Sequence, residues 1–136
     1  MITKVLDSWA VMAFLRDEPA ATVVEKLFVK ASEGKLELLM CVLNWGEIYY
    51  SIARTNGIHA AEIATSQLES LGIEWVGVSN DLQLVREAAR LKASKKMSYA
   101  DCFAAALAKS RNAELVTGDP EFKAIKQNLS LFWLEK

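Results

Sequence analysis

Short apolar runs alternate with helical segments along the whole 136-residue chain, and this alternation constrains the fold more than any other feature. The apolar runs predict strands at residues 2–6, 36–42, 73–78, 113–118 and 129–134. Periodic or capped segments between them predict helices at residues 8–16, 20–32, 44–55, 59–72, 81–94, 99–112 and 120–127. Ser79 or Asn80 is the expected cap of the helix at 81–94. Strands that alternate with helices pair in parallel, because each parallel connection needs a crossover. We therefore expect an α/β fold, a three-layer α/β/α sandwich with a central, mainly parallel sheet.

The length and the apolar runs limit the class of protein. A chain of 136 residues fits a single domain, residues 1–136, with one sizeable core. No apolar run approaches the roughly 18 residues that cross a bilayer, and "MITKVLDSW" lacks the pattern of a signal peptide. We expect a cytoplasmic protein without a membrane partner. Cys41 and Cys102 lie in apolar surroundings and are expected to be buried free thiols.

Several kinds of site are excluded by residues that the chain lacks. His59 is its single histidine, which rules out a zinc site built on several histidines and a nuclease with a histidine acid and a histidine base. No GxGxxG or GxxxxGK[ST] motif is present to cradle a nucleotide. The net charge of −1 also argues against a protein that binds nucleic acid through overall charge.

Four acidic residues stand where the predicted strands end or where the following helices begin. Asp7 follows the first strand, Asp119 follows the fourth, and Glu47 and Asp101 each lie one turn into a helix. In an open parallel sheet, binding sites form beyond the carboxyl ends of the strands. The four acids come from separate segments and are expected to converge at that edge.

Each acid has two interpretations. Asp7 and Asp119 can act as helix N-caps, Asp101 can form a capping box with Ser98, and Glu47 can pair with Asn44 in the same way. As a group, however, buried carboxylates repel one another, and a hard divalent cation such as Mg²⁺ or Mn²⁺ stabilises them. Such a site suits phosphodiester hydrolysis, because the metal lowers the pKa of a bound water and offsets charge on the phosphate.

Three segments, "VLDSWAVMAFLRDEP", "NWGEIYYSIAR" and "SYADCFAAALAKSRNAELVTGDPEFK", closely resemble the PIN-domain family. The likeness is greatest to the VapC-type toxins of prokaryotic toxin–antitoxin pairs and extends over essentially the whole chain. It implies a PIN-like fold and a ribonuclease that depends on Mg²⁺ or Mn²⁺. By position in the motifs, the resemblance assigns the catalytic and metal-binding acids to Asp7, Glu47, Asp101 and Asp119.

The resemblance also implies supporting polar residues and binding partners. Ser8, Asn44 and Thr117 match polar positions that flank the acids in the family, whereas bulky Trp9 stands where a small residue is frequent. VapC-like proteins usually form homodimers and are held inactive by a cognate antitoxin. The expected substrate is an RNA, whether a tRNA, an rRNA or an mRNA.

A basic run leads into the helix that carries Asp101. Within residues 86–96 it holds five cations against Glu87, namely Arg86, Arg90, Lys92, Lys95 and Lys96. The run is either a solvated helix face or a surface that binds RNA phosphates. Two other functions stay open: a non-catalytic PIN-fold module that binds RNA or protein, and a related metal-dependent DNA nuclease.

Overall fold

The computed structural model describes residues 1–135, and its five strands form one sheet in which every pair of neighbours is parallel. The strand order is β3-β2-β1-β4-β5, so the first strand lies at the centre. The strands are β1 (Ile2–Leu6), β2 (Leu36–Cys41), β3 (Glu74–Val76), β4 (Glu114–Thr117) and β5 (Leu131–Trp133). The predicted α/β class and the parallel sheet are confirmed.

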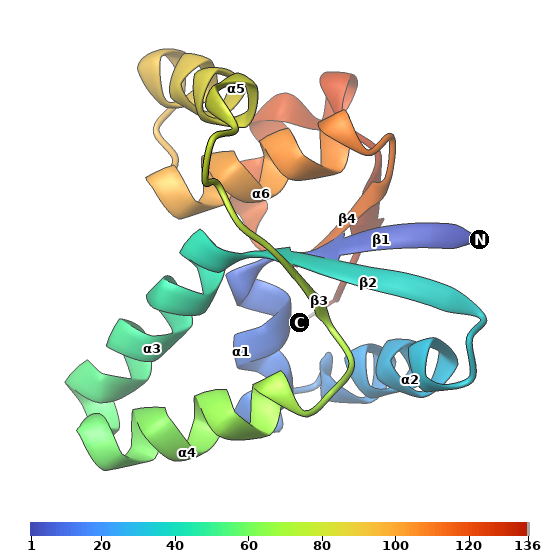
Figure 1. The fold of residues 1–136 in the computed structure, drawn as a ribbon, viewed down its shortest axis with the longest axis vertical. Coiled ribbons are helices and arrows are strands. Elements are labelled where there is room, and N and C mark those ends of the chain that lie inside the picture. The colour runs from blue at the N-terminus through green and yellow to red at the C-terminus, as the bar shows by residue number, and fades with distance from the viewer. Residues whose placement is uncertain (136) are drawn as a thin grey trace.

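Helices cover both faces of the sheet, as Figure 1 shows. The first face carries α1 (Ser8–Leu15), α2 (Ala21–Ser32), α3 (Val42–Asn56) and α4 (Ile58–Glu69). The second face carries α5 (Leu82–Ser94), α6 (Tyr99–Ser110) and the 3₁₀ helix η1 (Pro120–Asn128). The result is the expected three-layer α/β/α sandwich.

The two faces have separate apolar cores because successive side chains of a strand point to opposite sides of a sheet. Leu6 and Val116 pack with α1, α2, α3 and α4, whereas their neighbours Val5 and Leu115 pack with α5, α6 and η1. Every residue of β4 except Glu114 is buried. This explains why apolar residues stand side by side in the inner strands, as in Val5–Leu6 and Leu115–Val116, rather than alternating with polar ones.

Local signals set most of the element boundaries. Gly34 and Gly72 follow α2 and α4 with φ of 75° and 78°, a backbone conformation that glycine adopts without strain. The prediction of Ser79 or Asn80 as the cap of α5 is wrong: Asp81 accepts the capping hydrogen bond from Leu84 N at 3.0 Å. Asn80 instead has φ of 61°, a turn conformation rather than the extended one of an N-cap.

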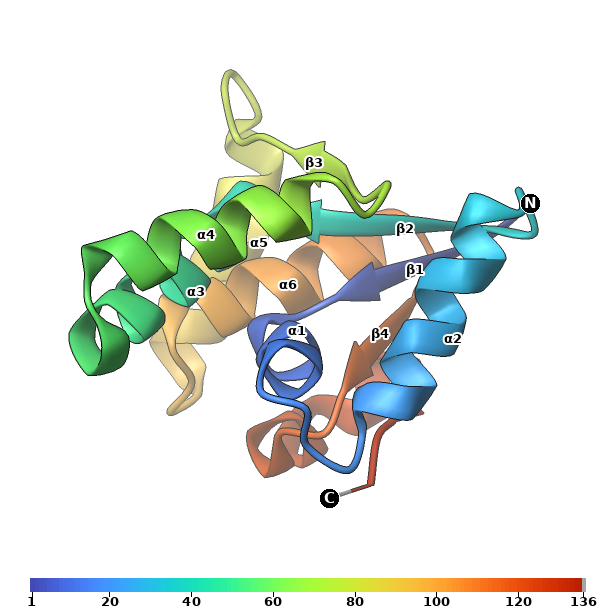
Figure 2. The same cartoon turned by 90° about the horizontal axis from the view of Figure 1, so that it is seen from below.

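The order of the strands creates a switch point at the centre of the sheet. From β1 the chain moves outward to β2 and β3, and it then returns to form β4 on the other side of β1. Figure 2 shows β1 and β2 pointing the same way, toward the side of the molecule where α3 lies. Ligands of open α/β sheets bind outside the carboxyl ends of the strands at such a point. A ligand site is therefore expected at the segments that follow β1 and β4.

Two smaller predictions concern the cysteines and the membrane. Cys41 and Cys102 are both buried and unbonded, as expected. None of the helices in residues 1–135 is both long enough and apolar enough to span a bilayer.

Candidate metal centre and active site

Asp7 occupies the centre of the switch point and is completely buried. It follows β1 directly, and its backbone N–H donates to Val116 O of β4 at 3.4 Å. Its Oδ1 accepts from Ala10 N at 2.9 Å and so caps α1, whereas its Oδ2 has no hydrogen-bond partner among the described residues. The carboxylate thus caps a helix through one oxygen and keeps a second, buried oxygen without a hydrogen-bond partner.

Burial is the largest cause of the raised pKa of Asp7, which lies at about 8. The hydrogen bond from Ala10 N and the nearby Thr117 side chain lower this pKa, and the charges of Asp101 and Asp119 raise it further. The same logic holds for Asp101, whose pKa is raised to about 7 by burial and then by the charges of Glu47, Asp119 and Glu121. These carboxylates are therefore close enough to repel one another.

The tightest group of acids lies at the start of α6 and the start of η1. Carboxylate oxygens of Asp101, Asp119 and Glu121 all lie within 4.8 Å of one another. Asp119 caps η1 by accepting from Glu121 N at 3.0 Å. Ser98 caps α6 by accepting from Asp101 N at 3.1 Å, and its hydroxyl lies 3.5 Å from Glu47 Oε2. Asp119 is thus both a cap and a member of the cluster, so the two interpretations of the sequence do not exclude each other. Asp101 belongs to the cluster, but the cap of α6 is Ser98.

Asn44 fixes the relative positions of the three helices around the acids. It is fully buried on α3, and its Nδ2 donates to Ser8 Oγ at 3.0 Å and to Ala100 O at 3.3 Å. Because Ser8 begins α1 and Ala100 belongs to the first turn of α6, one side chain joins all three elements. The expected capping pair of Asn44 with Glu47 is wrong, since α3 begins earlier, at Val42, after Cys41 as its cap.

An open groove of about 640 Å³ leads to the cluster. Glu47, Asp101, Asp119 and Glu121 line it, together with Ser8, Trp9, Met12, Arg16, Glu18, Ser51, Arg54, Thr55 and Ser98. Asp7 lies beneath this surface rather than on it. Trp9 forms part of the wall, and its ring packs so closely on Gly118 that a side chain at that glycine would overlap it.

A model of the PIN domain matches residues 4–128 of the chain. The chain belongs to the PIN domain family. This family membership accounts for the sheet order and for the acids gathered at its switch point, and it confirms the resemblance seen in the sequence.

Solved structures similar to this PIN domain include toxin–antitoxin proteins. VapBC2 from Rickettsia felis, bound to a DNA fragment from the promoter, has a TM-score of 0.72 and 18% identity over 98% of this chain and 100% of that chain. VapC20 from Mycobacterium tuberculosis, a toxin that cleaves the sarcin–ricin loop, has a TM-score of 0.70 and 15% identity, with 90% and 94% covered. At these identities the likeness shows the fold. No curated protein sequence matches the chain.

The donor set of this PIN domain fits a hard divalent cation. All the side chains that converge are carboxylates, one buried carboxylate oxygen lacks a partner, and neither of the two buried thiols belongs to the cluster. Mg²⁺ and Mn²⁺ prefer oxygen ligands of this kind. The cluster also includes Glu121, which the sequence analysis missed. The sequence does hold a clue to Glu121, because it is an acid two residues after Asp119, in the first turn of the helix that Asp119 caps.

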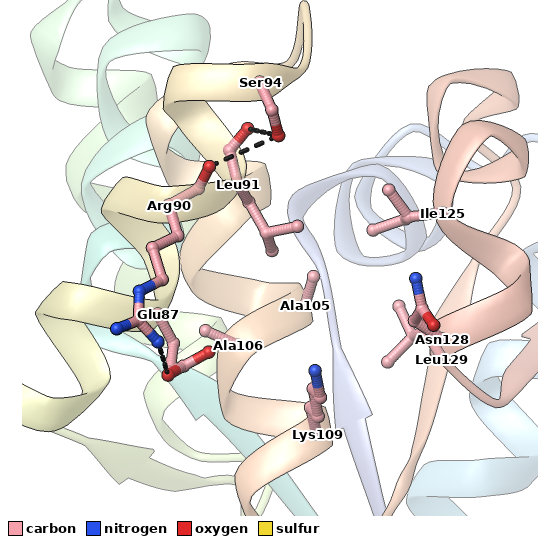
Figure 3. A pocket seen from close by; sticks show the side chains of 10 residues that line it. All are labelled: Glu87, Arg90, Leu91, Ser94, Ala105, Ala106, Lys109, Ile125, Asn128 and Leu129. Atoms are coloured by element: carbon pink, nitrogen blue, oxygen red, sulfur yellow. Dashed lines mark hydrogen bonds and ion pairs between the residues drawn. The ribbon is translucent and has the colours of Figure 1, made fainter.

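The predicted basic run does not line the groove. Lys92 Nζ donates to Met97 O at 2.9 Å, and Arg90 pairs with Glu87 at 3.1 Å. Figure 3 shows Arg90 and Glu87 at a different pocket, between α5, α6 and η1, with Ile125 on its far side. Arg86, Lys95 and Lys96 are exposed on α5 and on the loop that follows it. A role for these five cations in RNA binding stays a prediction.

Proposed function

We propose that this PIN domain, residues 1–136, is a Mg²⁺- or Mn²⁺-dependent endoribonuclease and the toxin of a VapBC-type toxin–antitoxin pair in the cytoplasm. The proposal is carried by the acids gathered at the switch point, where Asp101, Asp119 and Glu121 lie close together. The charges of Asp101 and Asp119 also reach buried Asp7, which keeps one oxygen without a hydrogen-bond partner. Where burial and like charges raise the pKa of a carboxyl group, its ionised form needs a counter-charge to be stable. The similarity to VapBC2 and VapC20 supports the same function.

In this proposal, Asp7, Glu47, Asp101 and Asp119 hold the cation, and Glu121 completes the cluster. The bound cation supplies the positive charge that acidifies water and offsets charge on the phosphodiester. Thr117 lies near Asp7, where it lowers the pKa of that carboxyl, and its Oγ1 accepts from Asp119 N at 3.0 Å, so it supports two of the acids. Asn44 and Ser8 hold α1, α3 and α6 in register, so that acids from three helices face one point.

The proposed partners follow from the relatives. VapBC structures from Rickettsia felis and Salmonella typhimurium support a cognate antitoxin as the regulator of this chain. The VapC20 comparison supports RNA as the substrate, with tRNA, rRNA and mRNA as the classes to test. A homodimer is the proposed assembly, as in VapC-like proteins.

Cleavage of total RNA by the purified protein tests the proposal. We expect discrete cuts with Mn²⁺ that leave 5′-phosphate and 3′-hydroxyl ends, and no cuts with EDTA. The Asp101→Asn variant is expected to lose cleavage, whereas Glu69→Gln, which neutralises an exposed acid on α4, should keep it. Cuts that persist in EDTA or leave 2′,3′-cyclic phosphates would rule out the metal-dependent mechanism. RNA binding without any cleavage would favour a non-catalytic binding module.

A further inference from the structure

The groove that reaches the acid cluster also has a basic part. Arg16 and Arg54 both line it. Arg16 is the C-cap of α1, and Arg54 lies in the last turn of α3. The acids of the same two helices lie at the opposite ends, because Asp7 caps the start of α1 and Glu47 follows the start of α3 by one turn. Charge of opposite sign is thus separated along each helix.

Both helices extend away from the sheet, so the number of residues along each helix sets the distance of its arginine from the acids. Figure 1 shows α1 and α3 both leading away from the strand ends on the same side of the sheet. At 1.5 Å per residue, Arg54 lies about 10 Å along α3 from Glu47, and Arg16 about 14 Å along α1 from Asp7. A stacked nucleic-acid strand advances by about 3.4 Å per nucleotide, so these lengths match about three to four nucleotides.

Neither arginine is used by the fold as an ion-pair partner. Both are exposed, and no carboxylate of residues 1–135 lies within 4 Å of either guanidinium. The guanidinium of Arg54 lies 4.8 Å from the centre of the Tyr50 ring, which orients it without neutralising it. Glu18 lines the same groove but pairs with neither arginine, so the charge of both guanidinium groups stays available to a ligand.

The groove wall between Asp7 and Arg16 on α1 is largely apolar, whereas polar Ser51 lines it between Glu47 and Arg54 on α3. Trp9 and Met12 line the groove on α1, between Asp7 and Arg16 in sequence. Sites for single-stranded nucleic acid combine cations that follow the backbone with aromatic side chains that contact the bases. Guanidinium groups suit the backbone, because they bind phosphate oxygens through two parallel hydrogen bonds.

We infer that Arg16 and Arg54 bind backbone phosphates of a single-stranded RNA segment that extends along α1 and α3 from the phosphodiester at the acid cluster. The inference rests on the proposed nuclease function and adds the residues that hold the strand. It moves the main phosphate contacts from the basic run at residues 86–96 to the two arginines. The RNA then lies in the groove with a base over the apolar surface near Trp9.

Binding of RNA at several salt concentrations tests the inference. The probe is a fluorescent single-stranded RNA of mixed sequence with Mn²⁺ present, bound to the Asp101→Asn protein so that cleavage does not interfere. Adding Arg16→Gln or Arg54→Gln is expected to weaken binding roughly tenfold. Each is also expected to reduce the slope of log affinity against log salt by about 0.7. Arg111→Gln, which removes an exposed arginine at the far end of α6, is the matched control and should change neither value.

Cleavage by the otherwise native chain separates this inference from the proposed function. We expect the arginine variants to raise KM for the RNA while kcat and the Mn²⁺ affinity measured by calorimetry stay near wild-type values. If the wild-type protein cleaves RNA and both variants keep its KM and salt slope, the inference is wrong and the nuclease stands. If the wild type neither cleaves RNA nor binds Mn²⁺, the proposed function fails, while the salt slope still decides whether the arginines contact RNA. A loss caused only by the Lys95→Gln/Lys96→Gln variant would return the contact to the basic run and overturn the inference.

Discussion

At the scale of single residues, the acids of this chain serve two purposes at once. Asp7 and Asp119 cap helices through one oxygen, and the same carboxylates contribute charge to the cluster. A cap needs only an acceptor, whereas a cation site needs a charge. Substitutions that separate these two properties therefore reveal which one governs stability.

Asp7→Asn retains the acceptor and removes the charge. Asparagine caps a helix about as well as aspartate, so we expect the metal-free variant to be more stable than wild type at pH 8, by on the order of 1 kcal/mol or more. Asp7→Ala removes the bond to Ala10 N as well and should lose about 0.5–2 kcal/mol relative to Asp7→Asn. Urea unfolding in EDTA measures both. If Asp7 acted only as a cap, Asp7→Asn would match wild type and only Asp7→Ala would lose stability.

Asn44→Ala removes the hydrogen bonds that join α3 to Ser8 and Ala100. We expect a loss of about 1–3 kcal/mol in the free energy of unfolding, because buried polar groups lose their partner. Ser8→Ala should cost less, since Asn44 keeps its bond to Ala100 O. Urea unfolding of the two variants and their combination gives the coupling energy. Strictly additive losses would show that the bond between these side chains contributes nothing.

Sequence reasoning was most successful at this scale, although it was incomplete. The four acids stood out because strand ends and motifs mark them, and the structure brings their charges together. Glu121 was missed because helical spacing does not place residues i and i+2 on one face. Asp119, however, lies outside η1, and its side chain bends back to accept from Glu121 N. That cap, rather than helical periodicity, brings the two carboxylates together.

At the scale of elements, the connection from β4 to η1 passes so close to Trp9 and Leu134 that only glycine fits at position 118. A Cβ at this position would overlap the Trp9 ring and come within 2.8 Å of Leu134 O. Trp9 stands out in the sequence as unusually bulky, but its contact with Gly118 could not be predicted, because the two residues are far apart in sequence. The Trp9 ring on α1 fills the space that a side chain at Gly118 would occupy, next to Asp119.

Gly118→Ala is expected to lower the free energy of unfolding by about 1–3 kcal/mol through overpacking. Because Asp119 is the next residue, Mn²⁺ affinity should fall as well. Adding Trp9→Ala should recover part of the stability lost at Gly118, since the overlap with the ring disappears while the contact with Leu134 O remains. A double-mutant cycle by thermal unfolding measures the coupling. No coupling would mean that the ring moves aside without cost.

The boundaries of elements were harder to predict than their existence. Every predicted strand and helix is present, yet β3 and β5 contain three residues each where six were expected. Edge strands pair on one side only, so fewer of their residues meet the criteria for a strand. The cap of α5 was misassigned because Ser79, Asn80 and Asp81 are all favourable caps, and the backbone of the turn decides among them.

At the scale of the whole molecule, the buried carboxyls make stability depend on pH. Asp7 has its pKa raised from 3.8 to about 8 in the folded chain, so the metal-free folded state holds a proton that the unfolded state releases. Its contribution to stability is complete below about pH 4 and is lost as the pH rises toward 8. Asp101, with a pKa of about 7, acts in the same direction.

Thermal unfolding at several pH values tests this dependence. In EDTA, the melting temperature of the wild type should fall between pH 5 and pH 8. Mn²⁺ binds the ionised carboxylates, so its stabilising effect should increase over the same range and reach roughly 8 °C at a hundredfold excess over Kd. The Asp101→Asn variant should show a weaker response to Mn²⁺. A Mn²⁺ effect that is the same at every pH would contradict binding at these groups.

The strand order also has a consequence for synthesis of the protein. β1 lies at the centre of the sheet and is made before its neighbour β4 and before the segments that carry Asp101 and Asp119. A nascent chain that has emerged only through α4 can pair β1 with β2 but has no partner for its other edge. The acid cluster therefore assembles only after α6 and the start of η1 have left the ribosome. Under the proposed function, the chain has no complete nuclease site before that point, and the interval in which an antitoxin must capture it begins there.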